Sequence, residues 1–374
     1  KNMKKLLLVA NVSKEHIRKF HIPFILRMKE LGWQVDVACK MDAAIPECDH
    51  SYDLPCDRNP FSGGIRKSIR ILKQIISEND YDVVHCNTVT GSIIGRVAAK
   101  SFRKKGVKVL YTNHGLHFFE GAPINRWILG YPMEKMLAPY TDVIITINQA
   151  DYRLVKKHLS NCGVVERIHG IGVDLSHFRN ASLSVNRQKI RASLGIASND
   201  YVLAYVAEIN TNKNQAALLE VFRIVQKIIP FSKLLLIGPD HTNGKFKKNI
   251  CEKGMEKDVL LLGWRDDIPE LLSSSDIYVA SSRSEGLGLN LIEAMACGIP
   301  VVAFKNRGHN EIVNHNKNGF LVNQDAYEEM AQCIIKVYDD EKLRKRITSQ
   351  AQIDISKYEI ANVLKELEKI YAKI

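Results

Sequence analysis

Short, almost entirely apolar runs alternate along this chain with segments of helical periodicity, and no other feature limits its possible folds as strongly. Residues 6–10 read as a buried strand, residues 17–31 carry apolar side chains at helical spacing, and residues 35–38 form the next apolar run. Continuous apolar strands separated by helices are typical of βαβ units, in which helices cover both faces of a parallel sheet. The pattern predicts an α/β, doubly wound fold.

The alternation occurs in two blocks. The first predicts further strands at 83–85, 107–111 and 143–146, and helices at 64–77, 90–104 and 127–137. After a glycine-punctuated pause near 163–180, the second predicts strands at 202–207, 233–238, 259–261, 277–280 and 301–303, with helices at 215–228 and from 289. A length of 374 residues agrees with about two domains. We expect two Rossmann-like domains facing across a cleft, at 1–172 and 173–355, and a C-terminal helix at 356–374 that packs back toward the N-terminal domain.

The positive charge of the chain is concentrated in its first half. The formal net charge is +12, and residues 1–170 contribute +10 of it, from 26 Lys and Arg against 16 Asp and Glu. The basic residues cluster in two runs: Arg66, Lys67, Arg70 and Lys73, and then Arg96, Lys100, Arg103, Lys104, Lys105 and Lys108. Two interpretations stay open: a solvated helix face, or a surface for an anionic membrane with 127–129 as its apolar insertion. Nucleic acid is not expected as a partner, because no recognition-helix, RNP-type or OB-type pattern accompanies the charge.

Cysteine spacing and hydropathy point to a cytoplasmic protein. The eight cysteines show no Cys-x-x-Cys pair and no zinc-knuckle spacing, which favours free thiols. No signal peptide is evident, and no apolar run approaches the ~20 residues that span a bilayer. Any membrane contact is therefore expected to be peripheral, at the inner face of the cell membrane.

The segment 281–300 carries the strongest chemical signal. It follows a predicted strand, contains Gly286 and Gly288, and leads into a helix. Such a turn presents backbone N–H groups and a helix N-terminus to an anion such as a phosphate. A plain strand-to-helix turn capped by Asn290 shares this spacing, and the third glycine of the dinucleotide fingerprint is missing. What favours a ligand site is the carboxylate pair, with Glu285 before the turn and Glu293 one helical turn inside the helix.

This segment resembles the Glu-x7-Glu signature of retaining glycosyltransferases of family 4, the group 1 enzymes with the two-domain GT-B fold. The resemblance implies that Glu285 contacts the hydroxyl groups of the donor sugar and that Glu293 holds the ribose. It also implies that the backbone of the turn lines the diphosphate, namely Gly286, Leu287, Gly288, Leu289 and Asn290.

The resemblance extends over almost the whole chain. In the segment 206–215, Lys213 matches the lysine that the family places on the donor phosphates, whereas Glu208 stands where an arginine is usual. Arg265 is the candidate that could compensate for that arginine. His114, after the strand at 107–111, matches the family histidine that meets the donor sugar. The implied catalytic residues are His114, Lys213 and Glu285.

The candidates on the acceptor side lie in the N-terminal half. Lys14 and His16 occupy the first loop, where many family members have a Gly-Gly pair, and simple exposure is the alternative for both. His117 is open between acceptor binding and a local capping or packing role. Trp127 belongs to the apolar segment 121–132, which resembles a subgroup that builds bacterial surface polysaccharides.

Metal-independent catalysis without a cofactor is expected. Asp80-Tyr81-Asp82 has the Asp-x-Asp spacing that some sugar transferases use for a divalent metal, but it precedes a strand. Sites in doubly wound domains lie at the carboxyl ends of strands, so this motif is interpreted as a solvated turn.

These observations predict a retaining hexosyltransferase. It would move a sugar from a nucleotide-diphosphate donor, a UDP-sugar, to a lipid-linked or saccharide acceptor in capsular, exopolysaccharide, lipopolysaccharide or O-antigen synthesis. A nucleotide-sugar epimerase of the same fold is the alternative, and a non-catalytic binding protein is a third hypothesis. The identity of the sugar, the acceptor, the linkage and the oligomeric state stay open.

Overall fold

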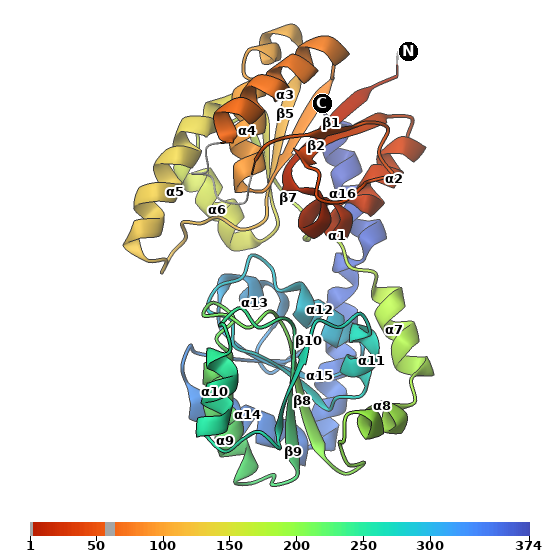
Figure 1. Cartoon of the computed structure of the whole chain (residues 1–374), viewed down its shortest axis with the longest axis vertical. Coiled ribbons are helices and arrows are strands. Elements are labelled where there is room, and N and C mark those ends of the chain that lie inside the picture. The colour runs from red at the N-terminus through yellow and green to blue at the C-terminus, as the bar shows by residue number, and fades with distance from the viewer. Residues whose placement is uncertain (1–2, 57–63) are drawn as a thin grey trace. The chain divides into compact units, whose positions relative to one another are not determined.

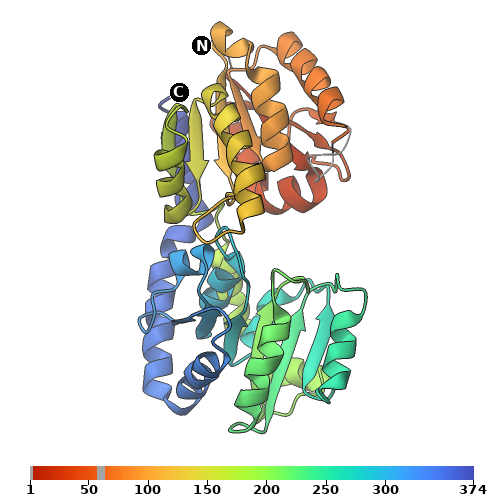
Figure 2. The same ribbon diagram turned by 90° about the vertical axis from the view of Figure 1, so that its left-hand side faces the viewer.

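The computed structural model describes residues 3–56 and 64–374. The chain divides into two compact units: residues 1–172 with 360–374, and residues 173–359. Each unit is built around one parallel sheet with helices on both of its faces (Figures 1 and 2). The predicted pair of doubly wound, Rossmann-like domains is confirmed.

The first unit contains a seven-stranded sheet in the order β3-β2-β1-β4-β5-β6-β7. Its strands are β1 (Lys5–Val12), β2 (Gln34–Lys40), β3 (Ser51–Asp53), β4 (Val83–Asn87), β5 (Lys108–Asn113), β6 (Val143–Thr146) and β7 (Val164–Arg167). The two outermost strands, β3 and β7, are absent from the sequence prediction. Both are short and contain no buried residue, because an edge strand buries less of its surface than a central one.

The main helices of the first unit are α2 (Ile22–Glu30), α3 (Ile65–Asn79), α4 (Val89–Ala99), α5 (Ile124–Leu137), α6 (Gln149–His158) and α16 (Ile360–Tyr371). The single helix predicted at 17–31 is wrong in detail. A π-helical turn η1 (Ser13–Ile17) and a short α1 (Arg18–Phe20) precede α2, and His21 separates α1 from α2. Pro23 lies in the first turn of α2, where its missing N–H is tolerated, and it favours a new helix start there.

The predicted helix at 90–104 is also two elements, because α4 ends at Ala99 and a 3-10 turn η2 (Phe102–Lys105) follows. Arg96 does not belong to a basic surface stripe. Its side chain is buried and paired with Glu134 of α5 at 2.8 Å, so it ties α4 to α5. Arg103 is paired with Asp142 at 2.7 Å.

The C-terminal helix α16 packs on the first unit, as expected from the sequence. Tyr371 Oη lies 2.7 Å from His85 Nδ1 in β4, and Arg27 Nε of α2 donates to Glu368 at 2.6 Å. Where the chain passes from the first unit to the second, Gly172 has a φ of +85° and lies against Ile360. A Cβ at this position would stand 2.8 Å from the Ile360 Cα. A glycine is therefore required at this crossing.

The second unit contains a six-stranded sheet in the order β10-β9-β8-β11-β12-β13. Its strands are β8 (Tyr201–Val206), β9 (Ser232–Ile237), β10 (Val259–Gly263), β11 (Ile277–Ala280), β12 (Val301–Phe304) and β13 (Phe320–Val322). Its helices are α7 (Leu175–Ser184), α8 (Arg187–Ser193), α9 (Gln215–Gln226), α10 (Lys245–Glu252), α11 (Ile268–Ser273), α12 (Leu289–Ala296), α13 (Arg307–Ile312), α14 (Tyr327–Asp339) and α15 (Glu341–Asp354).

The strand order fixes where a ligand can bind in each unit. In the second unit the chain runs outward from β8 through β9 to β10, and then restarts on the other side of β8 with β11. In the first unit the same reversal falls between β1 and β4. Ligands of open α/β sheets bind beyond the carboxyl ends of the strands at such a switch point. Ligands are therefore expected at the loops after β8 and β11 in the second unit, and at those after β1 and β4 in the first.

Candidate active site

The loops that follow β8 and β11 lie side by side at the switch point of the second unit, and hydrogen bonds join them. Ser281 Oγ donates to the Lys213 carbonyl at 2.7 Å, and Asn212 Nδ2 donates to the Ser284 carbonyl at 3.0 Å. The Arg283 backbone N–H donates to the Asn212 carbonyl at 2.8 Å. These bonds fix the backbone on both sides of the site before any ligand binds.

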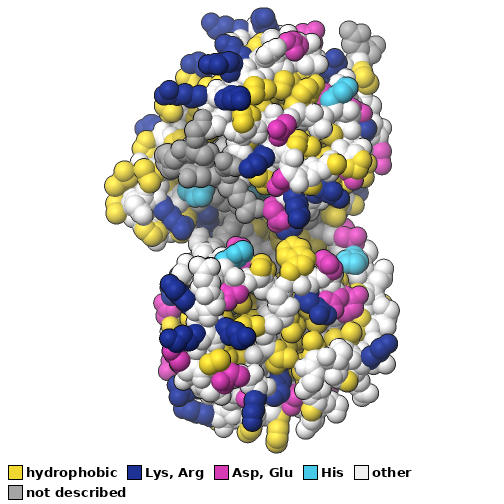
Figure 3. Space-filling model, viewed as in Figure 1, with side chains coloured by type: hydrophobic (Ala, Val, Ile, Leu, Met, Phe, Trp, Pro, Cys, Tyr) yellow, Lys and Arg dark blue, Asp and Glu magenta, His cyan; other side chains and the backbone are white. Residues whose placement is uncertain are grey.

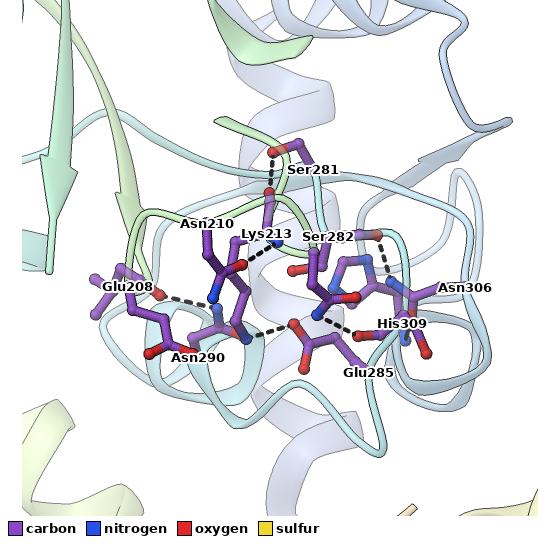
Figure 4. Close-up of polar contacts among 12 residues, drawn as sticks. Glu208, Asn210, Lys213, Ser281, Ser282, Glu285, Asn290, Asn306 and His309 are labelled. Carbon is purple, nitrogen blue, oxygen red and sulfur yellow. Dashed lines mark hydrogen bonds and ion pairs between the residues drawn. The ribbon is translucent and has the colours of Figure 1, made fainter. Parts of the chain in front are cut away.

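Lys213 and Glu285 meet between these two loops (Figure 4). Lys213 Nζ lies 2.6 Å from Glu285 Oε1, and only 19% and 14% of the two side chains are exposed. Burial opposes ionisation of Glu285, but the charge and hydrogen bond of Lys213 outweigh it and lower the pKa of this carboxyl group. The site therefore holds an ionised carboxylate next to a lysine at neutral pH.

The turn between Glu285 and α12 has the shape that the sequence predicts for an anion site. Gly288, with a φ of +85°, is the N-cap of α12 and has no side chain to cap the helix. Asn290, the alternative cap, lies inside the helix: its Nδ2 donates to the Val206 carbonyl at 3.0 Å, and its Oδ1 accepts from the Leu291 N–H at 3.0 Å. The helix dipole and the backbone N–H groups at this glycine N-cap would stabilise an anion.

The other residues predicted for this turn frame it. Leu287 is buried, while Gly286, Leu289 and Glu293 are half-buried. Burial raises the pKa of Glu293 to about 7. Glu293 therefore changes its protonation state near physiological pH, and a hydroxyl group brought beside it can either donate to the carboxylate or accept from the acid.

His309 is a residue of this site that the sequence analysis missed. It lies in α13, after β12, and its Nδ1 is 2.7 Å from the Phe304 carbonyl. Its ring packs on Gly288, where an added Cβ would stand 3.2 Å from Cδ2. Burial lowers its pKa, although Glu285 acts in the opposite direction. The rule that sites lie at the carboxyl ends of strands could have found it, since β12 is the neighbour of β11.

The side chains of Glu208 and Arg265 pair with residues other than Lys213 and Glu285. The Glu208 carboxylate faces His241 Nε2 at 3.3 Å and is about half exposed. Arg265 follows β10, three places from β11 in the sheet, and its Nε donates to Asp267 at 2.7 Å. The structure does not bring the Arg265 guanidinium, in its pairing with Asp267, to the turn before α12.

In the first unit, His114 is held at the end of β5. His114 Nε2 lies 2.9 Å from the Oδ1 of Asn87, the last residue of β4. Burial lowers the pKa of His114 to about 4, so the ring is neutral at neutral pH. Its ring centroid is 5.0 Å from that of His16 and 5.7 Å from that of His21. The structure thus brings together two predicted residues, His114 and His16, and adds His21.

The remaining acceptor-side candidates are more dispersed. The backbone N–H of Lys14 donates to Asp42 Oδ1 at 2.8 Å, and the Lys14 side chain is exposed. His117 is exposed in the loop before α5. Trp127 is half-buried, and its Nε1 donates to the Phe119 carbonyl at 3.0 Å. The indole of Trp127 therefore fastens α5 to the loop that precedes it.

Two family models match the chain, one in each half. The model of the group 1 glycosyl transferases matches residues 186–354, and the glycosyl transferase 4-like model matches residues 5–148. The chain is 37% identical to EpsD of Bacillus subtilis (strain 168), which is named as a glycosyltransferase, over 99% of this chain and 96% of that protein.

A second relative is the UDP-Gal:alpha-D-GlcNAc-diphosphoundecaprenol alpha-1,3-galactosyltransferase of Escherichia coli, which is 28% identical over 74% of this chain and 71% of its own length. Among solved structures, Anabaena HepE in complex with UDP-glucose superposes with a TM-score of 0.80 at 20% identity, covering 99% of this chain and 100% of HepE. WaaG, a glycosyltransferase involved in lipopolysaccharide biosynthesis, superposes with a TM-score of 0.75 at 13% identity, covering 98% of this chain and 99% of WaaG. The chain belongs to the group 1 glycosyltransferases of the GT-B fold.

Proposed function

We propose that this glycosyltransferase transfers a sugar from a UDP-sugar to a lipid-linked or saccharide acceptor, with retention of the anomeric configuration, in the synthesis of a bacterial surface polysaccharide. The observation that carries the proposal is the Lys213–Glu285 pair in the loops beside α12, whose N-cap is Gly288. A lysine, a carboxylate and the dipole of a helix that starts at a glycine are together suited to a sugar joined to a diphosphate.

Each group of the second unit has a distinct task in this proposal. The N–H groups at the start of α12 bind the diphosphate, and Lys213 turns from Glu285 to the phosphate oxygen that becomes the leaving group. Glu285 then accepts hydrogen bonds from the sugar hydroxyl groups, and Glu293 holds the ribose. No metal ion is needed, because Lys213 and the helix dipole neutralise the charge that develops on the leaving diphosphate.

The choice of UDP is supported by relatives rather than by a contact in this chain. HepE is described in complexes with UDP and with UDP-glucose, and the Escherichia coli relative is named for UDP-Gal. The name of that relative also includes GlcNAc-diphosphoundecaprenol, a lipid-linked sugar, which supports a lipid-linked acceptor here.

In the first unit, we assign His114 to the donor sugar and the neighbouring loop residues Lys14, His16 and His117 to the acceptor side. The neutral ring of His114 suits hydrogen bonding to a hydroxyl group, because a protonated ring would be repelled by the oxocarbenium-like charge at the anomeric carbon.

The α5 helix supports peripheral binding to an anionic membrane, with the active site on the cytoplasmic side. Its exposed apolar residues are Ile124, Ile128, Leu129 and Met136, between 62% and 75% exposed. Figure 3 shows hydrophobic side chains where α5 lies in Figure 1, and Lys and Arg gathered elsewhere on the same unit. Apolar insertion together with basic charge is the combination that binds anionic lipid reversibly. Among the described residues, no helix is long and apolar enough to span a bilayer.

A transfer assay with matched variants tests the enzymatic proposal. Glu285→Gln and Lys213→Ala should each lower transfer from UDP-sugars by at least about 100-fold. The controls are Glu220→Gln and Lys253→Ala, which break another ion pair with the same 2.6 Å separation. Equal activity in both sets of variants would show that the site is misassigned. Proton NMR of the product decides between retention and inversion, and conversion of a UDP-sugar without an acceptor would indicate an epimerase.

Flotation with anionic liposomes tests the membrane proposal. Ile128→Ser combined with Leu129→Ser should abolish flotation, whereas Ile353→Ser should not, because Ile353 is equally exposed (65%) but lies in α15 of the other unit. Wild-type protein that fails to float at low salt contradicts the proposal.

A further inference from the structure

Three histidine side chains from separate segments meet at the carboxyl end of the first unit's sheet. His16 lies in η1 after β1, His21 lies between α1 and α2, and His114 follows β5. Their potential ligand nitrogens all lie within 4.8 Å of one another. The fold creates this convergence, because β1, β4 and β5 are neighbours in the sheet and the segments that follow β1 and β5 bring the ring centroids of His16 and His114 to 5.0 Å.

The spacing of the nitrogens is close to that of a zinc site. Two imidazole ligands of a tetrahedral Zn²⁺ have nitrogens about 3.3 Å apart, given Zn–N bonds of about 2.0–2.1 Å. His16 Nε2 and His21 Nε2 are hydrogen-bonded at 3.0 Å, close to one edge of such a site, and a metal ion would take the place of the proton between them. All three nitrogens lie within 4.8 Å of one another, so no separation would have to shorten by more than about 1.5 Å.

The hydrogen bond that His114 makes also suits a metal. His114 Nε2–H donates to Asn87 Oδ1, which leaves Nδ1 as the nitrogen with a lone pair. A second ring nitrogen held by an amide or carbonyl oxygen is the usual support of a metal-bound histidine.

We propose that His16, His21 and His114 form a binding site for a divalent transition-metal ion, with Zn²⁺ as the preferred ion. Three imidazole nitrogens without a carboxylate suit Zn²⁺ and disfavour Mg²⁺ and Ca²⁺. Three protein ligands leave the fourth position to water, and the half-buried His16 and His114 allow entry from solvent. A bound ion occupies His114, so it inhibits sugar transfer; this consequence, unlike the binding itself, rests on the proposed function.

Titration of the full chain with Co²⁺ tests the site without any assay of activity. Chelator-treated protein should bind one equivalent of Co²⁺ with the visible absorption bands of a four-coordinate ion, and Zn²⁺ should displace it. His16→Ala and His114→Ala should each weaken Zn²⁺ binding by at least about 100-fold, and Asn87→Ala by about 10- to 100-fold. The control is His177→Ala, an exposed histidine in α7 of the second unit, which should bind as the wild type does.

His21 is buried, so the variant His21→Ala is informative only if circular dichroism and melting show that this variant folds. The variant His16→Ala tests the site without depending on the folding of His21→Ala. Absence of the cobalt bands, or equal Zn²⁺ affinity in His16→Ala and His177→Ala, overturns the proposal. Zn²⁺ should inhibit transfer by the wild type, and a chelator should restore it. If no transfer is detected at all, the proposed function fails while the cobalt titration still decides the metal site. If Zn²⁺ binds at His16 and His114 without slowing transfer, the inhibitory consequence is refuted.

Discussion

Replacing Lys213 with methionine should lower both stability and activity, and the loss of stability should depend on pH. The substitution keeps an apolar chain of similar length but leaves the Glu285 carboxylate, 14% exposed, without its cation. Removing one partner of a buried ion pair costs about 3–5 kcal/mol, and the slight exposure of this pair places it near about 3 kcal/mol. For a unit of this size, that corresponds to a fall in apparent Tm of about 6–12 °C.

The pH dependence follows from Glu285. In the wild type its lowered pKa stabilises the fold above the ordinary value of 4.5, and this contribution is lost as the pH falls through the lowered pKa. In Lys213→Met only burial acts on Glu285, so its pKa rises and the ionised group destabilises the fold at neutral pH. Both effects disappear once the carboxyl is protonated in the folded and the unfolded chain. The difference between variant and wild type should therefore be large at pH 7, smaller at about pH 4, and smallest below the lowered pKa of wild-type Glu285.

Melting of both proteins at the two pH values measures this difference. Lys253→Met is the control, because its pair with Glu220 has the same 2.6 Å separation but side chains that are 23% and 37% exposed. Breaking that pair should cost less than about 1 kcal/mol. A loss in Lys213→Met that is equal at pH 7 and pH 4, or no larger than in Lys253→Met, refutes the assignment of Glu285 as a carboxylate held ionised by Lys213.

Three further substitutions probe other parts of the structure. Gly288→Ala should cost about 1–3 kcal/mol and weaken UDP binding, since φ is +85° and the new Cβ meets His309; an unchanged Tm and UDP affinity would contradict the described turn. Glu293→Gln should raise the apparent Tm at pH 8 but not at pH 4. The pKa of Glu293 is raised to about 7 in the folded chain, so its ionised carboxylate destabilises the fold as the pH rises above 4.5. Equal effects at both pH values would count against a buried, titrating Glu293. Tyr371→Phe should lower Tm by removing the partner of His85 Nδ1, at a cost of about 1–3 kcal/mol, and an unchanged Tm would mean that α16 is not held by this bond.

The sequence predicts the central part of each sheet because buried parallel strands are apolar throughout. Residues 6–10 are each fully buried, so their character is evident without any knowledge of their neighbours. The edge strands Ser51–Asp53 and Val164–Arg167 lack that signal, since one side of each strand faces no partner strand. Their positions depend on pairing with β2 and β6, which the local sequence does not express.

The sequence predicts those site residues that lie close together in the chain. It does not predict those that only the fold brings together. Glu285 and Gly288 lie in one continuous turn, so their spacing is informative. His21 and His309 gain their significance from residues distant in the chain: His21 from His114, and His309 from the turn at Gly288. The prediction for Arg96 is wrong for the same reason. Its charge suggests an exposed basic stripe, but its guanidinium is paired with Glu134, which is 38 residues away in the chain.

Titration calorimetry with UDP and with uridine tests the central claim most directly, namely that Lys213 and the start of α12 bind the diphosphate of the donor. Wild-type protein should bind UDP more tightly than uridine by at least about tenfold, or about 1.4 kcal/mol. Lys213→Met should lose most of that difference while Lys253→Met retains it. Equal binding of UDP and uridine by the wild type, or full retention of the difference in Lys213→Met, would contradict the claim.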